Sequence, residues 1–148
     1  MRCAGLKNVE LTERIPDAQF DLVHSTIVLQ HIPVDDGYRI IGELARCVAP
    51  GGFGALHVSL RAGTRRARVF LWCMKHVPFA PNVWNRVRRR PWSYPHMQMN
   101  SYRLDHVLEL LAASGIPEVR SIYLPSAGAV GFHSVMLVFH GAEPAARR

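Results

Sequence analysis

The feature that most constrains the fold is a strand–helix–strand pattern in the first half of the chain. Phe20–Ser25 is a short apolar run broken only by Asp21 and His24, which is typical of a buried parallel strand. Phe53–Leu60 alternates in polarity and predicts a second strand. A helical pattern lies between the two runs, so the sequence predicts a βαβ unit with a right-handed crossover.

The predicted crossover helix has one apolar face and a boundary at each end. Pro33 precedes it, and Asp35 or Asp36 is expected to cap its N-terminus. Pro50-Gly51-Gly52 is expected to end it. Its apolar positions are spaced three and four residues apart, as one buried helix face requires. They are Ile40, Ile41, Leu44, Ala45, Cys47 and Val48.

Shorter patterns predict the remaining elements. Val9–Leu11, Val119–Leu124 and His133–His140 are expected to form strands. A helix is expected to start at Asn100 or Ser101 and to end before Gly115.

Composition limits the class of protein. The chain has 148 residues, 49% of them apolar and 20% charged, so it is expected to fold as a single domain spanning residues 1–148. No apolar run approaches the roughly 20 residues of a membrane-spanning helix, and a cytoplasmic location is expected. The three cysteines have no zinc-ligand spacing, so no metal site is predicted. Cys47 is expected to act as a small buried hydrophobe.

Positive charge is concentrated in one segment. Residues 61–90 hold nine lysines and arginines and no acid. Because the whole chain carries +7, the remainder is acidic by two charges. Residues 61–100 also hold all three tryptophans and several prolines, and we interpret them as an insertion in the domain with a short helix at Val69–Lys75. Arg86–Trp92 is a contact for nucleic-acid phosphate or anionic lipid, or a contact for an acidic small-molecule acceptor, or a solvated loop.

Residues 20–33, FDLVHSTIVLQHIP, and residues 50–58, PGGFGALHV, together resemble the middle of a class I S-adenosylmethionine (SAM) dependent methyltransferase. Residues 97–102, MQMNSY, are a weaker match to the same family. The resemblance implies an α/β fold: a partial Rossmann-like sheet, mostly parallel with an antiparallel last strand, and helices on both faces. The family's strand order is 3-2-1-4-5-7-6, and the predicted strands would be its third to seventh.

The resemblance also implies a cofactor site, because the family binds SAM at the carboxyl ends of its strands. Ser25, Thr26, Ile27 and His31 would face the methionine part of SAM. Two alternatives stay open: Ser25 as a turn residue, and His31 as a histidine at the start of a helix, bonded to a backbone carbonyl.

For the methyl acceptor, the resemblance implies a pocket near the segment that precedes the penultimate helix. The residues implied for substrate binding are Gln30, Met97, Met99, Asn100 and Tyr102. The methionines are equally interpreted as core residues that fill irregular space. No catalytic residue is assigned, because methyl transfer from an activated sulfonium depends chiefly on positioning.

The chain departs from the family's pattern before Phe20. No GxGxG motif is found, and no acidic residue follows such a loop at the expected spacing. We therefore expect the chain to be a C-terminal part of such an enzyme, with its cofactor cradle largely missing. The edge of the strand at residues 20–24 would then be exposed, and we expect a homodimer along it.

The sequence thus favours one function and leaves others open. The favoured function is SAM-dependent methyl transfer to a small-molecule acceptor. The alternatives are a non-catalytic interaction module that uses the basic segment for an anionic partner, and an inactive truncated methyltransferase. Binding of the cofactor separates the first from the other two.

Overall fold

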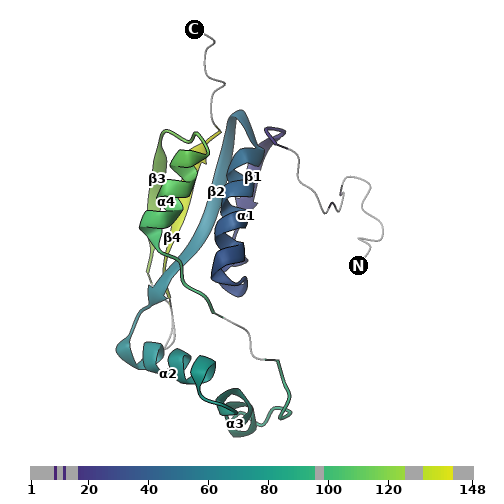
Figure 1. Cartoon of the computed structure of the whole chain (residues 1–148), viewed down its shortest axis with the longest axis vertical. Coiled ribbons are helices and arrows are strands. Elements are labelled where there is room, and N and C mark those ends of the chain that lie inside the picture. The colour runs from purple at the N-terminus through teal and green to yellow at the C-terminus, as the bar shows by residue number, and fades with distance from the viewer. Residues whose placement is uncertain (1–8, 10–11, 13–16, 96–98, 126–131, 142–148) are drawn as a thin grey trace.

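The computed structural model describes residues 9, 12, 17–95, 99–125 and 132–141. They form a sheet covered by two helices and a separate pair of helices at one end (Figure 1). The elements are, in chain order, β1 (Phe20–Ser25), the 3-10 helix η1 (Leu29–His31), α1 (Val34–Cys47), β2 (Val48–Ala62), α2 (Arg65–His76), α3 (Ala80–Val87), α4 (Leu104–Ala113), β3 (Val119–Leu124) and β4 (Phe132–His140).

The four described strands are ordered β1-β2-β4-β3. β1 pairs with β2 in parallel, and β4 pairs antiparallel with both β2 and β3. Three strands therefore run in one direction and the last runs against them, which confirms the predicted sheet. If β1 corresponds to the family's fourth strand, this order reads 4-5-7-6, as the resemblance implies.

The core lies between the sheet and two helices on the same face of it. Leu56 and Leu137 are opposite each other in the β2–β4 pairing and fully buried. Ile41 of α1 and Leu111 of α4 belong to the same buried cluster. Figure 1 shows α1 and α4 side by side over the sheet. Helices were expected on both faces, but the described residues provide no second helical layer.

The opposite face of the sheet carries apolar side chains in contact with solvent. Leu22 and Phe53 are paired neighbours on β1 and β2, and Ile122 lies on the outer strand β3. All three are at least 48% exposed. Apolar residues at these positions indicate a sheet face suited to burial.

Several predicted boundaries were wrong. The N-cap of α1 is Pro33, and Asp35 and Asp36 lie in its first turn without a capping bond, where their charges still favour the helix dipole. Pro50-Gly51-Gly52 does not end the helix but lies within β2, which starts at Val48. The backbone tolerates this because Gly51 takes a φ of 77° at an irregular strand start. Val9 lies in no strand, and Glu10 and Leu11 are outside the described residues.

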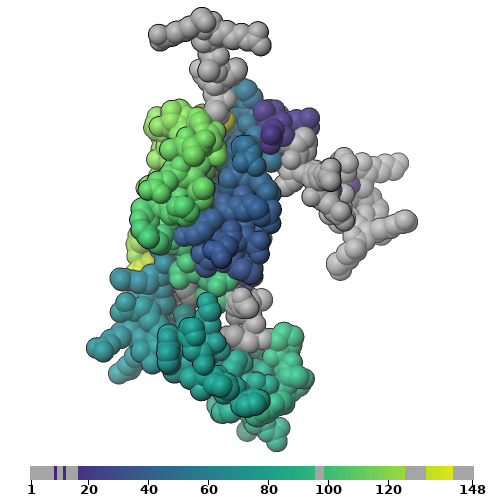
Figure 2. Space-filling view, viewed as in Figure 1, coloured from purple at the N-terminus to yellow at the C-terminus, as the bar shows by residue number. Residues whose placement is uncertain are grey.

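The segment expected to be an insertion forms a lobe of two helices, teal in Figure 2, beyond the end of the sheet. α2 extends the predicted helix at both ends, and its earlier start is explained by an N-cap, because the Thr64 hydroxyl accepts a hydrogen bond from Ala67 N at 3.1 Å. α3 was not predicted. It packs on α2 through an edge contact between the rings of Phe70 and Trp84, 4.9 Å apart.

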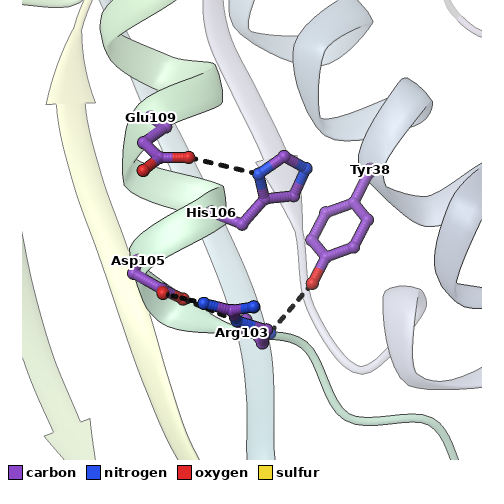
Figure 3. A network of polar contacts seen from close by, with 5 residues as sticks. All are labelled: Tyr38, Arg103, Asp105, His106 and Glu109. Carbon is purple, nitrogen blue, oxygen red and sulfur yellow. Dashed lines mark hydrogen bonds and ion pairs between the residues drawn. The ribbon is translucent and has the colours of Figure 1, made fainter.

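α4 starts later than predicted, at Leu104, and is tied to α1 by the polar network of Figure 3. The Tyr38 hydroxyl accepts a hydrogen bond from Arg103 N at 3.0 Å. The His106 ring packs edge-on against the Tyr38 ring with 4.4 Å between centroids. Arg103 also pairs with Asp105, which lowers the pKa of that carboxyl and favours its charged form at the helix start.

Two glycines of α1 provide a matched test of this packing. Both are buried helical residues, for which alanine normally adds roughly 0.5–1 kcal/mol of stability. A Cβ at Gly37 would lie 2.6 Å from Tyr102 Cζ, whereas a Cβ at Gly42 meets only Arg46 Nη1 at 3.9 Å. We expect Gly37→Ala to destabilise the fold by about 1–3 kcal/mol through overpacking and Gly42→Ala to stabilise it. Urea unfolding of both variants measures the difference. Equal effects of the same sign would contradict the described packing of Tyr102.

Candidate functional site

The candidate site is formed where the loop after β1 meets the segment before α4. Asn100 joins the two segments with two hydrogen bonds. Its backbone N–H donates to Gln30 O at 2.7 Å, and its side-chain Nδ2 donates to Ile32 O at 2.9 Å. The structure therefore brings together two predicted substrate residues, Gln30 and Asn100, that are 70 positions apart in sequence.

Tyr102, which belongs to the buried core, also forms hydrogen bonds to the loop after β1. Its hydroxyl lies 2.8 Å from Leu29 O and 3.1 Å from Ile32 O, and its backbone N–H donates to Ser59 O at 2.8 Å. Burial, with smaller effects of Tyr38 and Asp36, raises the pKa of the Tyr102 hydroxyl and keeps it a donor. The side chain is only 3% exposed, so its contacts hold the loop in place.

Gln30 connects the sheet to His31. The buried Ser59 hydroxyl on β2 donates to Gln30 Oε1 at 3.0 Å. The Gln30 Nε2 group donates in turn to His31 Nε2 at 3.1 Å. Gln30 therefore links the His31 ring to Ser59 on β2.

The other predicted cofactor residues form the turn at the end of β1. Ser25 is 9% exposed on the core side of the strand. Thr26 Oγ1 is hydrogen-bonded to His24 Nε2 at 2.6 Å. Ile27 has a φ of 63°, a rare backbone conformation for a β-branched residue, and its side chain is 55% exposed. Strain of this kind is concentrated at functional turns, and here it projects Ile27 and the neighbouring Val28 into solvent.

A pocket of about 560 Å³ lies between the start of α1, the end of β2 and the α2–α3 lobe, and none of Ser25–His31 lines it. Two predicted substrate residues, Met99 and Asn100, line it. Its volume is in the range of small-molecule sites. Most of the remaining lining residues come from α2 or the end of β2, and sequence reasoning missed them. They are Val34, Arg61, Ala62, Arg68, Leu71, Trp72, Met74, Lys75, His76, Pro81 and Ser101.

A signal for the α2 residues was present in the sequence. Arg68, Trp72 and Lys75 are four and three positions apart, so they share one face of any helix that contains them. A helix was predicted at Val69–Lys75, but ligand contacts were predicted for Arg86–Trp92 instead. In the structure Arg88 and Arg90 lie over the rings of Trp84 and Tyr94, at 5.1 and 4.9 Å, away from the pocket.

Other candidate chemistry finds less support. Met97 lies outside the described residues. Within those residues, no cluster of three or more acidic, histidine or cysteine side chains is placed to hold a metal ion. Cys47 is 1% exposed, as expected of a small hydrophobe, and burial raises the pKa of its thiol. No helix in the described part of the chain has the length and apolarity to cross a membrane.

Comparison with known proteins finds similarity to methyltransferases in about the first third of the chain and in the fold. Residues 5–56, which include β1 and α1, match the family model described as a methyltransferase domain. Among curated protein sequences none matches. The fold resembles that of a SAM-dependent methyltransferase from Methanosarcina mazei, with a TM-score of 0.52 at 17% identity over 86% of this chain and 62% of that one. The resemblance to methyltransferases is therefore confirmed for residues 5–56, and the solved structure supports the predicted fold.

A second similar structure is an arsenic(III) S-adenosylmethionine methyltransferase from Chlamydomonas reinhardtii. It shares 17% identity over 86% of this chain and 40% of its own, with a TM-score of 0.47. The chain thus spans less than two thirds of the length of either solved structure.

Tyr102 and Tyr38 test whether the buried hydroxyl is what holds the loop. Tyr102→Phe removes this donor, while the Leu29 carbonyl keeps its bond from Ile32 N and the Ile32 carbonyl keeps its bond from Asn100, so we expect a loss of about 0.5–1.5 kcal/mol. Tyr38→Phe removes an acceptor at a helix end where water can replace it, so we expect a loss of under about 1 kcal/mol. Denaturant unfolding measures both. Faster amide exchange in η1 of Tyr102→Phe alone supports the assignment, and equal losses in the two variants would refute it.

Proposed function

We propose that this chain takes part in SAM-dependent methyl transfer to a small-molecule acceptor. One observation carries the proposal: the order β1-β2-β4-β3, with β4 antiparallel, matches the 4-5-7-6 order of the class I sheet. The match of residues 5–56 to a methyltransferase domain agrees with it. Fold alone does not give function, so the proposal depends on the site at the carboxyl end of β1.

The turn after β1 fits one side of a nucleoside–amino acid ligand. Exposed Ile27 and Val28 offer apolar surface, and Thr26 and His31 offer polar atoms beside it. Ser25, Thr26, Ile27 and His31 would hold the methionine part of the cofactor. When bound, SAM supplies an electrophilic methyl group on a sulfonium. The described residues of this turn include no acid for the ribose hydroxyls.

The acceptor side is the pocket wall formed by residues 99–102. Met99 and Asn100 line the pocket, and Asn100 also holds the backbone of the cofactor turn. Gln30, in the 3-10 helix η1, and the buried Tyr102 serve as positioning residues. This connection would keep the acceptor's nucleophilic atom at a fixed distance from the methyl group, which is the main requirement of the reaction.

Calorimetric titration with S-adenosylhomocysteine tests the cofactor site. We expect one-site binding, weakened at least about tenfold by Ile27→Asp, which places a charge on the apolar surface of the turn. Val83→Asp is the matched control, because Val83 is exposed to a similar degree, on α3, outside the site. An absence of binding in a chain with a cooperative thermal transition would mean that the resemblance reflects ancestry alone.

A homodimer along β1 is a second part of the proposal. β1 is an edge strand of the described sheet, and Leu22 on it is 65% exposed. An apolar edge of this kind favours pairing with another strand, here that of a second copy. We expect Leu22→Lys to shift the chain to monomer in sedimentation velocity. Ile122→Lys, on the other edge strand, should leave the dimer intact, and a monomeric parent chain would refute the pairing.

The basic segment is the feature that favours the alternative, a non-catalytic interaction module. Arg86 and Arg88–Arg90 are exposed on the lobe and pair with no acid among the described residues. Binding of a nucleic acid or anionic lipid through them, with a steep salt dependence and without S-adenosylhomocysteine binding, would support that function instead.

A further inference from the structure

The pocket lined by α2 and Asn100 has positively charged side chains in its wall. Arg61, Arg68 and Lys75 line it, and His76 adds a further group that gains positive charge on protonation. No acidic side chain is among the described lining residues. None of the three cations forms an ion pair with the described part of the chain. Three cations facing one concavity repel each other, and an anion bound among them relieves that repulsion.

The same wall is also aromatic and apolar. On α2, Arg68, Trp72 and Lys75 lie on one helix face, so an indole ring stands between two cations. The ring of Trp72 lies 5.3 Å from that of His76, at an angle of 36°. Apolar side chains of Val34, Leu71, Met74, Pro81 and Met99 complete the lining.

We propose that this pocket binds a small organic anion, a flat apolar body carrying a carboxylate or phosphate, as the methyl acceptor. The anionic group would lie between Arg68, Lys75 and Arg61, and the body against Trp72. The assignment of this ligand as the acceptor rests on the proposed function, whereas its binding does not. Asn100 connects the two, because it lines the pocket and also bonds to Gln30 and Ile32 of the cofactor turn.

The positive charge of the lining also determines which ligands the pocket excludes. An amine or other cation would enter a site already carrying unpaired positive charge, which is unfavourable. A neutral molecule of the same shape would gain only the apolar contacts. Charge-assisted hydrogen bonds from Arg and Lys contribute about twice as much as neutral ones. Selectivity for the anion over its neutral analogue is therefore the distinguishing property of the pocket.

Naphthoate and naphthamide are matched probes, since they differ chiefly in charge. In titrations followed by the indole N–H NMR signal of Trp72, we expect naphthoate to bind at least about tenfold more tightly than naphthamide. Naphthyl phosphate in a parallel titration separates the carboxylate from the phosphate class, and tighter binding of either anion supports the proposal. Equal affinity of naphthoate, naphthyl phosphate and naphthamide would overturn it.

Variants on α2 then locate the anion. Arg68→Met and Lys75→Met should each weaken naphthoate about tenfold, since each removes one charge-assisted contact. Arg66→Met is the control, because Arg66 is exposed on the same helix but does not line the pocket. If Arg66→Met weakens binding as much as the others, the anion is attracted to a diffuse basic surface and the proposal fails. The comparison of anion with amide needs no variant and stays decisive if a variant does not fold.

Calorimetry with S-adenosylhomocysteine on the same preparation separates this inference from the proposed function. Binding of naphthoate without S-adenosylhomocysteine would keep the anion site and overturn its role as an acceptor pocket. Binding of S-adenosylhomocysteine without either anion would keep the proposed function and overturn the acceptor class.

Discussion

The interaction on which the candidate site depends is the buried hydroxyl of Tyr102. It reaches the carbonyl oxygens of Leu29 and Ile32 from a segment about seventy residues later in the chain, and it does so through the space left by the missing side chain of Gly37. The turn after β1 would otherwise be a strained loop with exposed apolar residues and few local hydrogen bonds. Tyr102 and Asn100 bond to the loop from one side, and Ser59 bonds to it from the other through the Gln30 side chain, so the loop and residues 99–102 form one unit.

The sheet could be predicted from sequence because its signals are local. Phe20–Ser25 and Val119–Leu124 have the predicted boundaries, since a short apolar or alternating run between turn residues specifies a strand almost alone. The strand order followed from the family resemblance. Positions set by tertiary contacts could not be read in the same way. Residues 100–103 remain extended before α4 because their backbone and side chains bond to Gln30, Ser59, Ile32 and Tyr38 instead of starting a helix.

The candidate site was predicted in part for the same reason. Family motifs pointed to Asn100 and Met99, and both line the pocket. They also pointed to Tyr102, whose chemistry suits a ligand contact but whose burial makes it a positioning residue. The basic character of residues 61–90 was recognised from the sequence, but ligand contacts were predicted at Arg86–Trp92 and not at Arg68 and Lys75. Only the length and placement of α2 show that these two cations face a cavity shared with Asn100.

The proposed methyl-transfer site consists of the cofactor turn, the Asn100–Tyr102 segment and the basic pocket. The most direct measurement is a map of backbone amide NMR shifts as S-adenosylhomocysteine is added to the labelled chain. We expect shifts concentrated at Ser25–His31, with Asn100 responding through its bond to Gln30. A folded chain whose shifts are absent, or are confined to the α2–α3 lobe, would contradict a cofactor site at the end of β1.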